Sequence, residues 1–431
     1  MKVIPREQHC VSRKDISQGA LRVMARLRDE GHQAYLVGGA VRDLLLGNLP
    51  KDFDVATDAT PEEVRAAFRN SRIIGRRFRI VHVRQGREII EVTTFRGHHD
   101  DPEGAAAAPG KAQRSSRGLL LRDNVYGTLE DDALRRDLTV NALYYDSGTF
   151  EVLDHVNGTQ DLARRCIRVI GDPWVRYRED PVRMLRTVRF AAKLQFEIHA
   201  DSSEPIRDLA PLLDDIPSAR LFDEFGKLFL SGNGEATLGL LNDLSLLERL
   251  FPETAYLTAK SPLYESMLEC TMQNTDERIR EGKPVTPAFT LAAILWPAVN
   301  ERRKQLEEQG EHPIPSMHSA GQEIVAASCQ RIAIPKRFSL PMREIWEMQL
   351  RLGNTRSKKV VEQLKKRRFR AAYDFILLRE QAGEDMDGLG KFWTELQEQH
   401  PVEQHDPDPA MRRRPRRRGG RQRGPRNSLA D

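Results

Sequence analysis

Residues 34–57 read AYLVGGAVRDLLLGNLPKDFDVAT and place a glycine turn shortly before two carboxylates. The apolar run at residues 35–37 predicts a short buried strand. Gly38 and Gly39 follow this run, and glycine lets the backbone turn and come close to a ligand. The next residues favour a helix that Gly47 would end, so the glycine pair stands at a helix N-terminus. Free N–H groups and partial positive charge at such an end predict a phosphate-binding turn.

Two aspartates follow at short range, in residues 51–55, KDFDV. If this run is a strand, Asp52 and Asp54 lie on one face and the apolar residues beside them point to the core. Neighbouring carboxylates repel each other, which a protein tolerates most readily where cations lie between them. Mg²⁺ takes one or two carboxylates together with substrate phosphates. A lone glycine pair is usually a plain turn, and a lone Asp-x-Asp is more often a solvated strand edge. Both motifs together, in this order, instead favour a site that binds a nucleotide and a metal ion.

The pattern over residues 36–43 (LVGGAVRD) and 51–54 (KDFD) resembles the head motif of a known family. These are the polymerase-β-like nucleotidyltransferases of the bacterial tRNA nucleotidyltransferase and poly(A) polymerase type. The resemblance implies an α+β fold, with a head of a small mixed sheet and helices followed by an all-α neck and body. It implies that Asp52 and Asp54 are the catalytic metal ligands. It also implies nucleotide contacts for Gly38, Gly39 and Arg42.

A third acidic residue, Glu91, lies in the predicted strand at residues 88–95, EIIEVTTF. In this strand Glu91 shares a face with Ile89 and Thr93. An exposed strand glutamate is the ordinary interpretation of such a residue. Within the resemblance, Glu91 is instead a candidate catalytic carboxylate beside the two aspartates, either as a metal ligand or as a near neighbour of the metal.

Residues 130–143, EDDALRRDLTVNAL, open with acids and predict a helix. On this helix Asp137 and Asn141 would lie four residues apart on one face. An amphipathic helix alone would explain the periodicity. The run also resembles the second motif of the same family, which implies contacts to the ribose and triphosphate from Arg136, Asp137 and Asn141.

Strand signals fade near residue 150, and most of the remaining chain is helix-prone. Residues 178–190, REDPVRMLRTVRF, carry arginines at intervals of three, and most basic helix faces of this kind are merely solvated. The segment resembles the base-reading motif of the family, which implies that Asp180 and Arg183 select the nucleotide. Arginine only donates hydrogen bonds, whereas a carboxylate accepts them from an exocyclic amino group. Residues 217–228 resemble the next helix of the family, a support for that site.

The composition bounds the class of protein. At 431 residues the chain is long enough for two or three domains, and 39% hydrophobic with 30% charged residues is typical of a globular protein. No run of 18 apolar residues predicts a membrane span. The N-terminal residues show no export signal, so we expect a cytoplasmic location. The four cysteines are widely spaced, which argues against a disulfide framework or a zinc ribbon.

The positive charge is concentrated near the C-terminus. Residues 412–426, RRRPRRRGGRQRGPR, hold nine arginines and no acid. These nine exceed the net charge of +5 of the whole chain, so the rest of the protein is slightly acidic. A basic segment of this kind predicts binding to nucleic acid. The arginines expected to contact RNA are Arg412, Arg413, Arg414, Arg416, Arg417 and Arg418.

These patterns predict four parts of the chain. Residues 1–150 would form the catalytic head, with a mobile loop at residues 96–117 that is rich in glycine, alanine and serine. Residues 151–232 would form a helical neck for nucleotide recognition, and residues 233–399 a helical body that binds RNA. Residues 400–431 are polar and rich in proline, glycine and arginine, which predicts a disordered tail.

Residues 74–82, IGRRFRIVH, resemble the poly(A) polymerase branch of the family more than the CCA-adding branch. The resemblance implies template-independent addition of AMP from ATP to RNA 3′ ends, with two Mg²⁺ ions and release of pyrophosphate. It implies a role in RNA processing and decay, and the expected partners are ATP, single-stranded RNA 3′ ends and RNA-decay proteins. Two alternatives stay open: a CCA-adding tRNA nucleotidyltransferase, and a nonenzymatic RNA-binding scaffold, which the intact aspartates disfavour.

Overall fold

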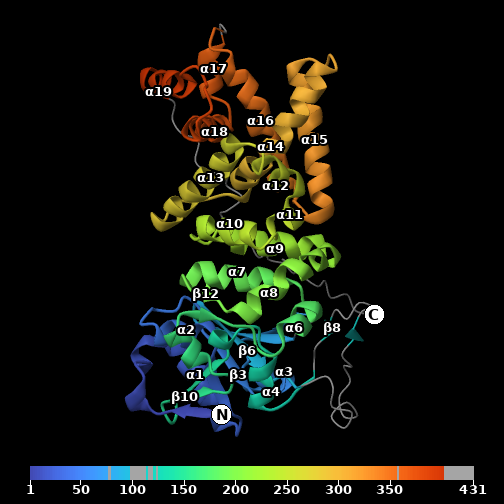
Figure 1. Ribbon diagram of the computed structural model, residues 1–431. Helices are drawn as coiled ribbons and strands as arrows, with labels where there is room; N and C mark the ends of the chain where they lie inside the picture. The colour runs from blue at the N-terminus through green and yellow to red at the C-terminus, as the bar shows by residue number, and fades with distance from the viewer. Residues whose placement is uncertain (76–78, 98–112, 115–119, 123–124, 357–358, 402–431) are drawn as a thin grey trace, which may run out of the picture.

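The computed structural model shows an elongated molecule (Figure 1). A sheet with its surrounding helices occupies the end that holds the N-terminus, and the chain beyond it is mainly helical. The arginine-rich segment and most of the predicted loop at residues 96–117 lie outside the described residues. The described residues are 1–75, 79–97, 113–114, 120–122, 125–356 and 359–401.

The sheet has eight strands in the order β1-β10-β9-β2-β3-β6-β5-β4. Strands β3 and β6 run parallel, and the other neighbours pair antiparallel. A mixed sheet followed by helices confirms the predicted α+β fold class. The strands are β1 (Lys2–Ile4), β2 (Ala34–Val37), β3 (Asp54–Thr57), β4 (Ser71–Ile74), β5 (Ile80–Gln85), β6 (Glu88–Thr94), β9 (Leu143–Asp146) and β10 (Glu151–Asp154).

The side chains of β6 alternate as the sequence predicts. Ile90 and Val92 are buried in the core, and Glu91 lies partly exposed on the other face. The parallel register places Asp54 of β3 directly beside Glu91. Side chains at paired positions of adjacent strands project from the same face of a sheet. Two carboxylates from separate stretches of the sequence are therefore neighbours.

Helix α1 packs against strands β2, β3 and β6. It begins where the hydroxyl of Ser17 accepts a hydrogen bond from the N–H of Ala20 at 3.0 Å, and Val23 and Leu27 are buried. The buried residues of this helix recur at helical spacing and form an apolar stripe that faces the sheet. The helices beside the sheet are α1 (Gln18–Asp29), α2 (Gly39–Leu45), α3 (Pro61–Ala67) and α4 (Leu129–Arg135).

Two strand predictions differ from the structure. Strand β3 begins at Asp54 and not at residue 51. Strand β2 ends at Val37, opposite Asp54, so the residues before Asp54 lack a partner on that side. Strand signals also do not end at residue 150, because β10 follows it and pairs with β9. The sheet therefore extends to Asp154.

Beyond the sheet, helices stack along the molecule (Figure 1), and a second, smaller apolar core around Trp393 joins α16 to α19. Among the described residues, no helix is both long enough and apolar enough to cross a membrane. These helices are α5 (Gly158–Ala163), α6 (Pro173–Glu179), α7 (Val182–Leu194), α8 (Ala200–Leu209), α9 (Ser218–Phe229), α10 (Gly234–Asp243), α11 (Leu247–Leu250), α12 (Pro252–Thr258), α13 (Pro262–Arg280), α14 (Pro287–Glu308), α15 (Pro313–Arg331), α16 (Lys336–Gly353), α17 (Val360–Leu364), α18 (Phe369–Gln381) and α19 (Leu389–Gln399).

Candidate active site

The glycine turn between β2 and α2 is closely surrounded. Gly38 has a φ of +74°, which residues with a side chain rarely adopt. Its N–H donates to the carbonyl oxygen of Leu143 at 3.0 Å. A Cβ at Gly38 would lie 3.5 Å from Nη1 of Arg136 and 3.6 Å from the carbonyl oxygen of Asn141. The turn therefore brings three predicted nucleotide-binding residues within contact distance.

Cations gather beside this turn, on helix α7 and on α2. The Cζ atoms of three arginines lie 4.4 to 5.8 Å from the centroid of the Phe190 ring, namely Arg42, Arg186 and Arg189. Burial, together with the charge of Arg42, lowers the pKa of Lys193 on the same helix. Helix α2 has seven residues and so few aligned peptide dipoles. Side-chain cations therefore gather beside the turn, although Arg42 and Arg186 are paired with Asp43 and Asp137.

The three predicted carboxylates lie together at the other side of the turn. In the sheet, Asp54 of β3 pairs with Val37, the last residue of β2 before the turn. On its other side Asp54 pairs with Glu91 of β6. Burial raises the pKa of Asp54 from 3.8 to about 6, and the negative charges of Glu91 and Asp52 act in the same direction. The charge of Arg136 opposes this shift. Glu91, Asp52 and Arg136 are therefore each within electrostatic range of Asp54.

This carboxylate group fits a divalent cation. Burial and mutual repulsion make the ionised form of Asp54 costly, and a nearby cation would remove that cost. Asp52 and Asp54 supply the one or two carboxylates that Mg²⁺ takes when substrate phosphates complete its coordination. Within the described ranges, no three His, Cys, Asp or Glu side chains are placed to hold a metal ion, so a cation here would take at most two of these carboxylates and would need substrate phosphates as its other ligands.

Arg136 is held in place by two residues. Its Nη2 donates to Oδ2 of Asp132 at 2.9 Å, and its Nε donates to the hydroxyl of Tyr144 at 2.9 Å. The Tyr144 hydroxyl in turn donates to Oδ2 of Asp132 at 2.7 Å. Because the guanidinium is already ordered beside Gly38, binding an anion there costs little additional conformational entropy.

Asp137 and Asn141 do not share one helical face, so that prediction is wrong. Helix α4 ends at Arg135, and the chain then pairs with a distant segment: the N–H of Thr139 donates to the carbonyl oxygen of Arg168 at 3.0 Å. A short 3₁₀ helix, η4 (Thr139–Asn141), leads into β9. Backbone hydrogen bonds to a segment far along the chain therefore replace those of the predicted helix.

The side chain of Asp137 connects this segment to helix α7. Nε of Arg186 donates to Oδ2 of Asp137 at 2.5 Å. Burial alone would raise the pKa of Asp137, but the charge of Arg186 and its hydrogen bond lower it to about 2. The carboxylate is therefore ionised at neutral pH, and the pair ties the sheet side of the site to α7.

Arg42 and Asn141 contact each other directly. Nη1 of Arg42 donates to Oδ1 of Asn141 at 2.5 Å, and its Nη2 lies 2.6 Å from Oδ1 of Asp43. The Arg42 side chain is only 2% exposed. Its guanidinium is therefore committed to protein groups next to the turn.

Asp180 and Arg183 lie where α6 meets α7, and each has a partner. Nη2 of Arg220, on α9, donates to Oδ2 of Asp180 at 2.6 Å. Nη1 of Arg183 donates to Oε2 of Glu179 at 3.1 Å. The segment at residues 217–228, predicted to support the site, therefore reaches Asp180 through Arg220.

Sequence reasoning missed Asp132, Tyr144 and Arg176. Nη2 of Arg176 donates to the carbonyl oxygens of Arg135 and Arg136 at 2.6 and 2.7 Å, and so fixes the end of α4. The partners of Arg176 lie about 40 positions away in the sequence. The acids that open the predicted helix at residue 130 were a signal for Asp132, but no local pattern marks Arg176.

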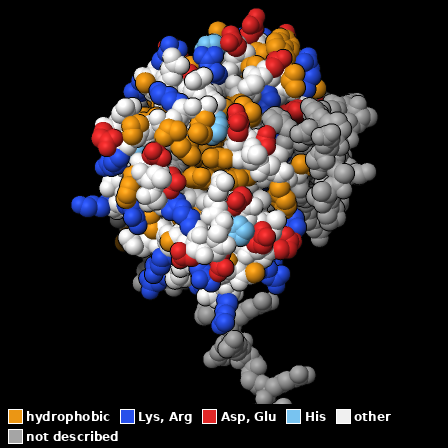
Figure 2. All heavy atoms as spheres, turned by 90° about the horizontal axis from the view of Figure 1, so that it is seen from below, with side chains coloured by type: hydrophobic (Ala, Val, Ile, Leu, Met, Phe, Trp, Pro, Cys, Tyr) orange, Lys and Arg blue, Asp and Glu red, His pale blue; other side chains and the backbone are white. Residues whose placement is uncertain are grey.

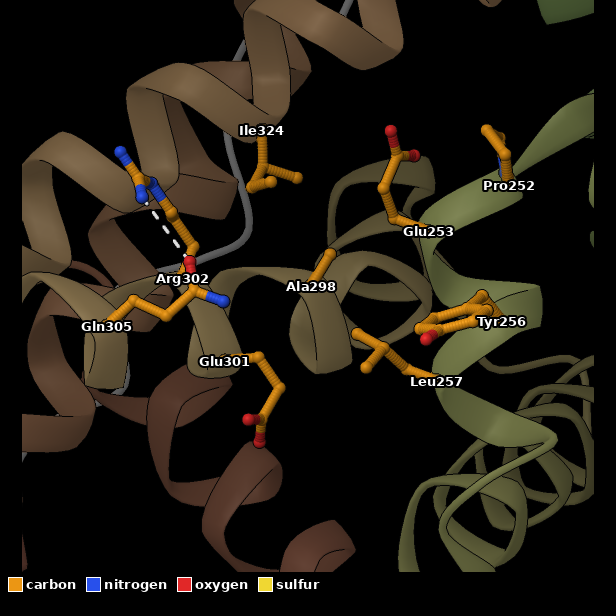
Figure 3. A pocket seen from close by; sticks show the side chains of 9 residues that line it. All are labelled: Pro252, Glu253, Tyr256, Leu257, Ala298, Glu301, Arg302, Gln305 and Ile324. Carbon is orange, nitrogen blue, oxygen red and sulfur yellow. Dashed lines mark hydrogen bonds between the residues drawn. The ribbon is translucent and has the colours of Figure 1, made fainter.

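Two surface features lie apart from these residues. Figure 3 shows a hollow between α12, α14 and α15, with Leu257 and Ile324 among its apolar walls. At its edge Arg302 donates to Gln305 at 3.3 Å, and the hollow includes none of the predicted site residues.

Figure 2 shows the sheet end of the molecule, where apolar side chains gather in a patch among charges of both signs. The predicted arginines at residues 412–418 lie outside the described residues.

Three family models match the chain. They are the poly A polymerase head domain at residues 34–168, the probable RNA and SrmB-binding site of polymerase A at residues 195–257, and the polymerase A arginine-rich C-terminus at residues 309–427. Poly(A) polymerase I of Salmonella typhimurium is 48% identical over 438 residues, covering 98% of this chain and 94% of the relative. The chain belongs to the poly(A) polymerase family. It is a nucleotidyltransferase, as predicted.

Relatives from the CCA-adding branch are more distant. A CCA-adding enzyme of Bacillus pumilus is 36% identical and covers 54% of each chain. A Thermotoga maritima CCA-adding enzyme complexed with tRNA_CCA has a TM-score of 0.62 at 18% identity, covering 97% of this chain and 92% of that one. This chain therefore shares its fold with CCA-adding enzymes. Its sequence similarity to poly(A) polymerase I, in contrast, extends over nearly its full length.

The raised pKa of Asp54 predicts that this residue destabilises the metal-free protein. In the unfolded chain Asp54 ionises near pH 4 and in the folded protein near pH 6, so its contribution to stability falls as the pH rises between these values. We expect Asp54→Asn to raise the free energy of unfolding by about 2–3 kcal/mol at pH 7. Urea unfolding of the parent protein and of Asp54→Asn, in a chelating buffer at pH 3.5 and at pH 7, would measure this difference in the free energy of unfolding. The difference from the parent protein should disappear at pH 3.5.

Proposed function

We propose that this poly(A) polymerase family member adds AMP from ATP to RNA 3′ ends without a template, releasing pyrophosphate. The observation that carries the proposal is the 48% identity to poly(A) polymerase I along 98% of the chain. The pairing of Asp54 with Glu91 beside the glycine turn supports it, because nucleotidyl transfer needs carboxylates next to a phosphate site. By this activity the protein would promote RNA processing and decay, in the cytoplasm and with RNA-decay proteins as partners.

We assign the carboxylates and the turn to the reacting groups. Two Mg²⁺ ions, when bound by Asp52 and Asp54, would activate the RNA 3′-hydroxyl and neutralise charge on the triphosphate. Gly38 and Gly39 leave room for the phosphates to approach the backbone, and the ordered guanidinium of Arg136 holds them by charge. These residues align the α-phosphate with the 3′-hydroxyl, so most of the protein's contribution is positioning.

We assign the choice of nucleotide to Asp180 and Arg183. The adenine edge presents an exocyclic amino group and ring nitrogens, which a carboxylate and a guanidinium can recognise. Arg220 and Glu179 hold these two side chains at 2.6 and 3.1 Å, so their geometry is set before the nucleotide enters. Asp137 and Asn141 complete the nucleotide site from the sheet side.

We also propose the four-part organisation expected from the sequence. The head, expected at residues 1–150, carries the carboxylates, and its sheet extends to Asp154. The neck, expected at residues 151–232, carries the base-selecting pair. The body at residues 233–399 and the arginines of the tail at residues 400–431 bind the RNA. The family models for an RNA-binding site, at residues 195–257, and for an arginine-rich C-terminus, at residues 309–427, support RNA binding by these parts, although the first model also covers the end of the neck.

A CCA-adding enzyme is the alternative that shares the fold. Its match in sequence covers 54% of this chain, against 98% for poly(A) polymerase I. Incubating the purified protein with an RNA and each nucleoside triphosphate separately tests the proposal. We expect long products from ATP and little incorporation of CTP. Addition of CTP that stops after two residues on a tRNA lacking its end would favour the CCA-adding alternative.

Substitution of either aspartate should abolish catalysis and leave the fold intact. We expect Asp52→Ala and Asp54→Ala each to lower AMP incorporation by at least about 1,000-fold, since a metal ligand contributes several kcal/mol to the transition state. Asp29→Ala changes an exposed aspartate of α1 and serves as the control. Near-normal turnover with Mg²⁺ in either active-site variant would contradict the assignment.

Substitution of Arg183 should weaken the preference for ATP. Arg183→Ala removes a charged donor from the proposed base site, so we expect the ratio of kcat/KM for ATP over CTP to fall by about 10- to 100-fold. Single-nucleotide incorporation with each substrate measures this ratio. Arg178→Ala, on the preceding helix, is the matched control. An unchanged ratio in Arg183→Ala would exclude this residue from base selection.

The arginines at residues 412–426 should tether RNA without affecting the chemistry. Neutralised phosphates release counterions, so log K should fall with log salt by about 0.7 per contact on single strands, or roughly six in total if all nine arginines engage. We expect truncation after residue 400 to weaken RNA binding and flatten this slope, while AMP incorporation at saturating RNA stays unchanged. Replacing the nine arginines by lysine should preserve the slope. Equal slopes for full-length and truncated protein would disprove the tether.

A further inference from the structure

Arg176 of α6 lies between the two ends of the proposed nucleotide site. Its side chain is only 13% exposed, and its guanidinium donates hydrogen bonds in two directions. Nη2 donates to the carbonyl oxygens of Arg135 and Arg136 at 2.6 and 2.7 Å. Nη1 donates to Oε2 of Glu179 at 3.0 Å. One guanidinium therefore holds both the backbone of the residue beside the glycine turn and the acid next to the proposed base-selecting pair.

The connection continues from Glu179 to Arg183. Nη1 of Arg183 donates to the same carboxylate oxygen, Oε2, at 3.1 Å, and to the carbonyl oxygen of Arg176 at 2.9 Å. Two guanidinium groups thus share one carboxylate oxygen. Arg183, at the start of α7, is held against α6, and α6 is held through Arg176 against the end of α4.

Burial makes this arrangement costly for Arg176. Burial and the positive charge of Arg183 lower the pKa of Arg176 to about 10, although the charge of Glu179 opposes the shift. The guanidinium therefore stays protonated at neutral pH in a place that disfavours its charge. A buried ion pair is weak evidence for a gain in stability. The contacts of Arg176 are better explained by the groups that they hold in place.

The side chains at the two ends have supports of their own. Asp132 and Tyr144 hold the guanidinium of Arg136 at 2.9 Å each, whereas Arg176 holds its backbone carbonyl group. At the other end, Arg220 holds Asp180 at 2.6 Å. Arg176 contacts both ends, so it can set how far apart they lie.

We propose that Arg176 is a positioning residue that sets the distance between Arg136, at the triphosphate, and Arg183, at the base. The proposal rests on the proposed function. Arg176 makes no contact with the nucleotide in this role, but it lets one nucleotide engage both ends at once, which raises the effective concentration of each end for the other. A planar guanidinium donates in two fixed directions, whereas a lysine ammonium is a compact charge on a flexible stem.

Arg176→Lys keeps the charge and removes the fork. Binding of a nonhydrolysable ATP analogue to the full-length protein in Mg²⁺ is compared with binding of tripolyphosphate, which lacks a base. We expect the affinity for the ATP analogue to fall about 10-fold. The affinity for tripolyphosphate should change less than about twofold, because Asp132 and Tyr144 still hold the Arg136 side chain. Arg178→Lys, at an exposed position of α6, is the matched control and should bind both ligands as the parent protein does.

Single-nucleotide incorporation measures the effect at the base. We expect Arg176→Lys to lower the ratio of kcat/KM for ATP over CTP by about 10-fold, with most of the change in KM for ATP. If Arg176 acts through Arg183, adding Arg176→Lys to Arg183→Ala should lower this ratio by no more than about a further twofold. Losses in the ratio that multiply would overturn the proposal.

Two binding results would also overturn it: an unchanged affinity of Arg176→Lys for the ATP analogue, or a loss of tripolyphosphate binding as large as the loss of ATP binding. Thermal unfolding of each variant detects a loss of fold. Arg176→Gln, which keeps a donor without a charge, should give the same pattern and replaces Arg176→Lys if that variant is unfolded. If the parent protein adds no AMP, the proposed function fails, while the comparison of the two ligands still tests the role of Arg176.

Discussion

The parallel pairing of β3 with β6 is the constraint on which the site depends. It brings Asp54 beside Glu91, and burial with their repulsion raises the pKa of Asp54 to about 6. The same two strands bury Val55 and Val92 on the opposite face. Because side chains alternate along a strand, the apolar core that fixes the register also fixes the distance between the carboxylates. Apolar burial thus stabilises an electrostatically unfavourable arrangement, and a bound cation would relieve it.

Ion pairs between distant segments place the remaining site residues. Arg186 of α7 pairs with Asp137 near the sheet, and Arg220 of α9 pairs with Asp180 between α6 and α7. These charges are partly buried, where an unpaired charge would be costly. The nucleotide site therefore lies where the sheet meets the first helices after it. A change in how these helices pack would move the proposed base-selecting residues relative to the carboxylates.

Local patterns predicted the parts of this site that depend on neighbours in sequence. The glycine turn and the alternation of β6 around Glu91 are confirmed. The helix predicted to carry Asp137 and Asn141 is wrong, because hydrogen bonds to residues near Arg168 replace it. A periodicity of 3.6 residues depends only on the side chains of the segment itself. It therefore cannot predict a hydrogen-bond partner about 30 positions away.

The sequence by itself determined the residue types, the class of fold and the membership of a family, because glycine conformation, side-chain alternation and motif spacing are local properties. It also contained both halves of the carboxylate group, in residues 51–54 and in Glu91. Only the tertiary structure decided that Glu91 stands beside Asp54, that His82 faces it, and that Arg42 is enclosed by protein groups. These relations depend on strand register and helix packing, whose free energy comes from apolar surfaces buried between segments far apart in the chain.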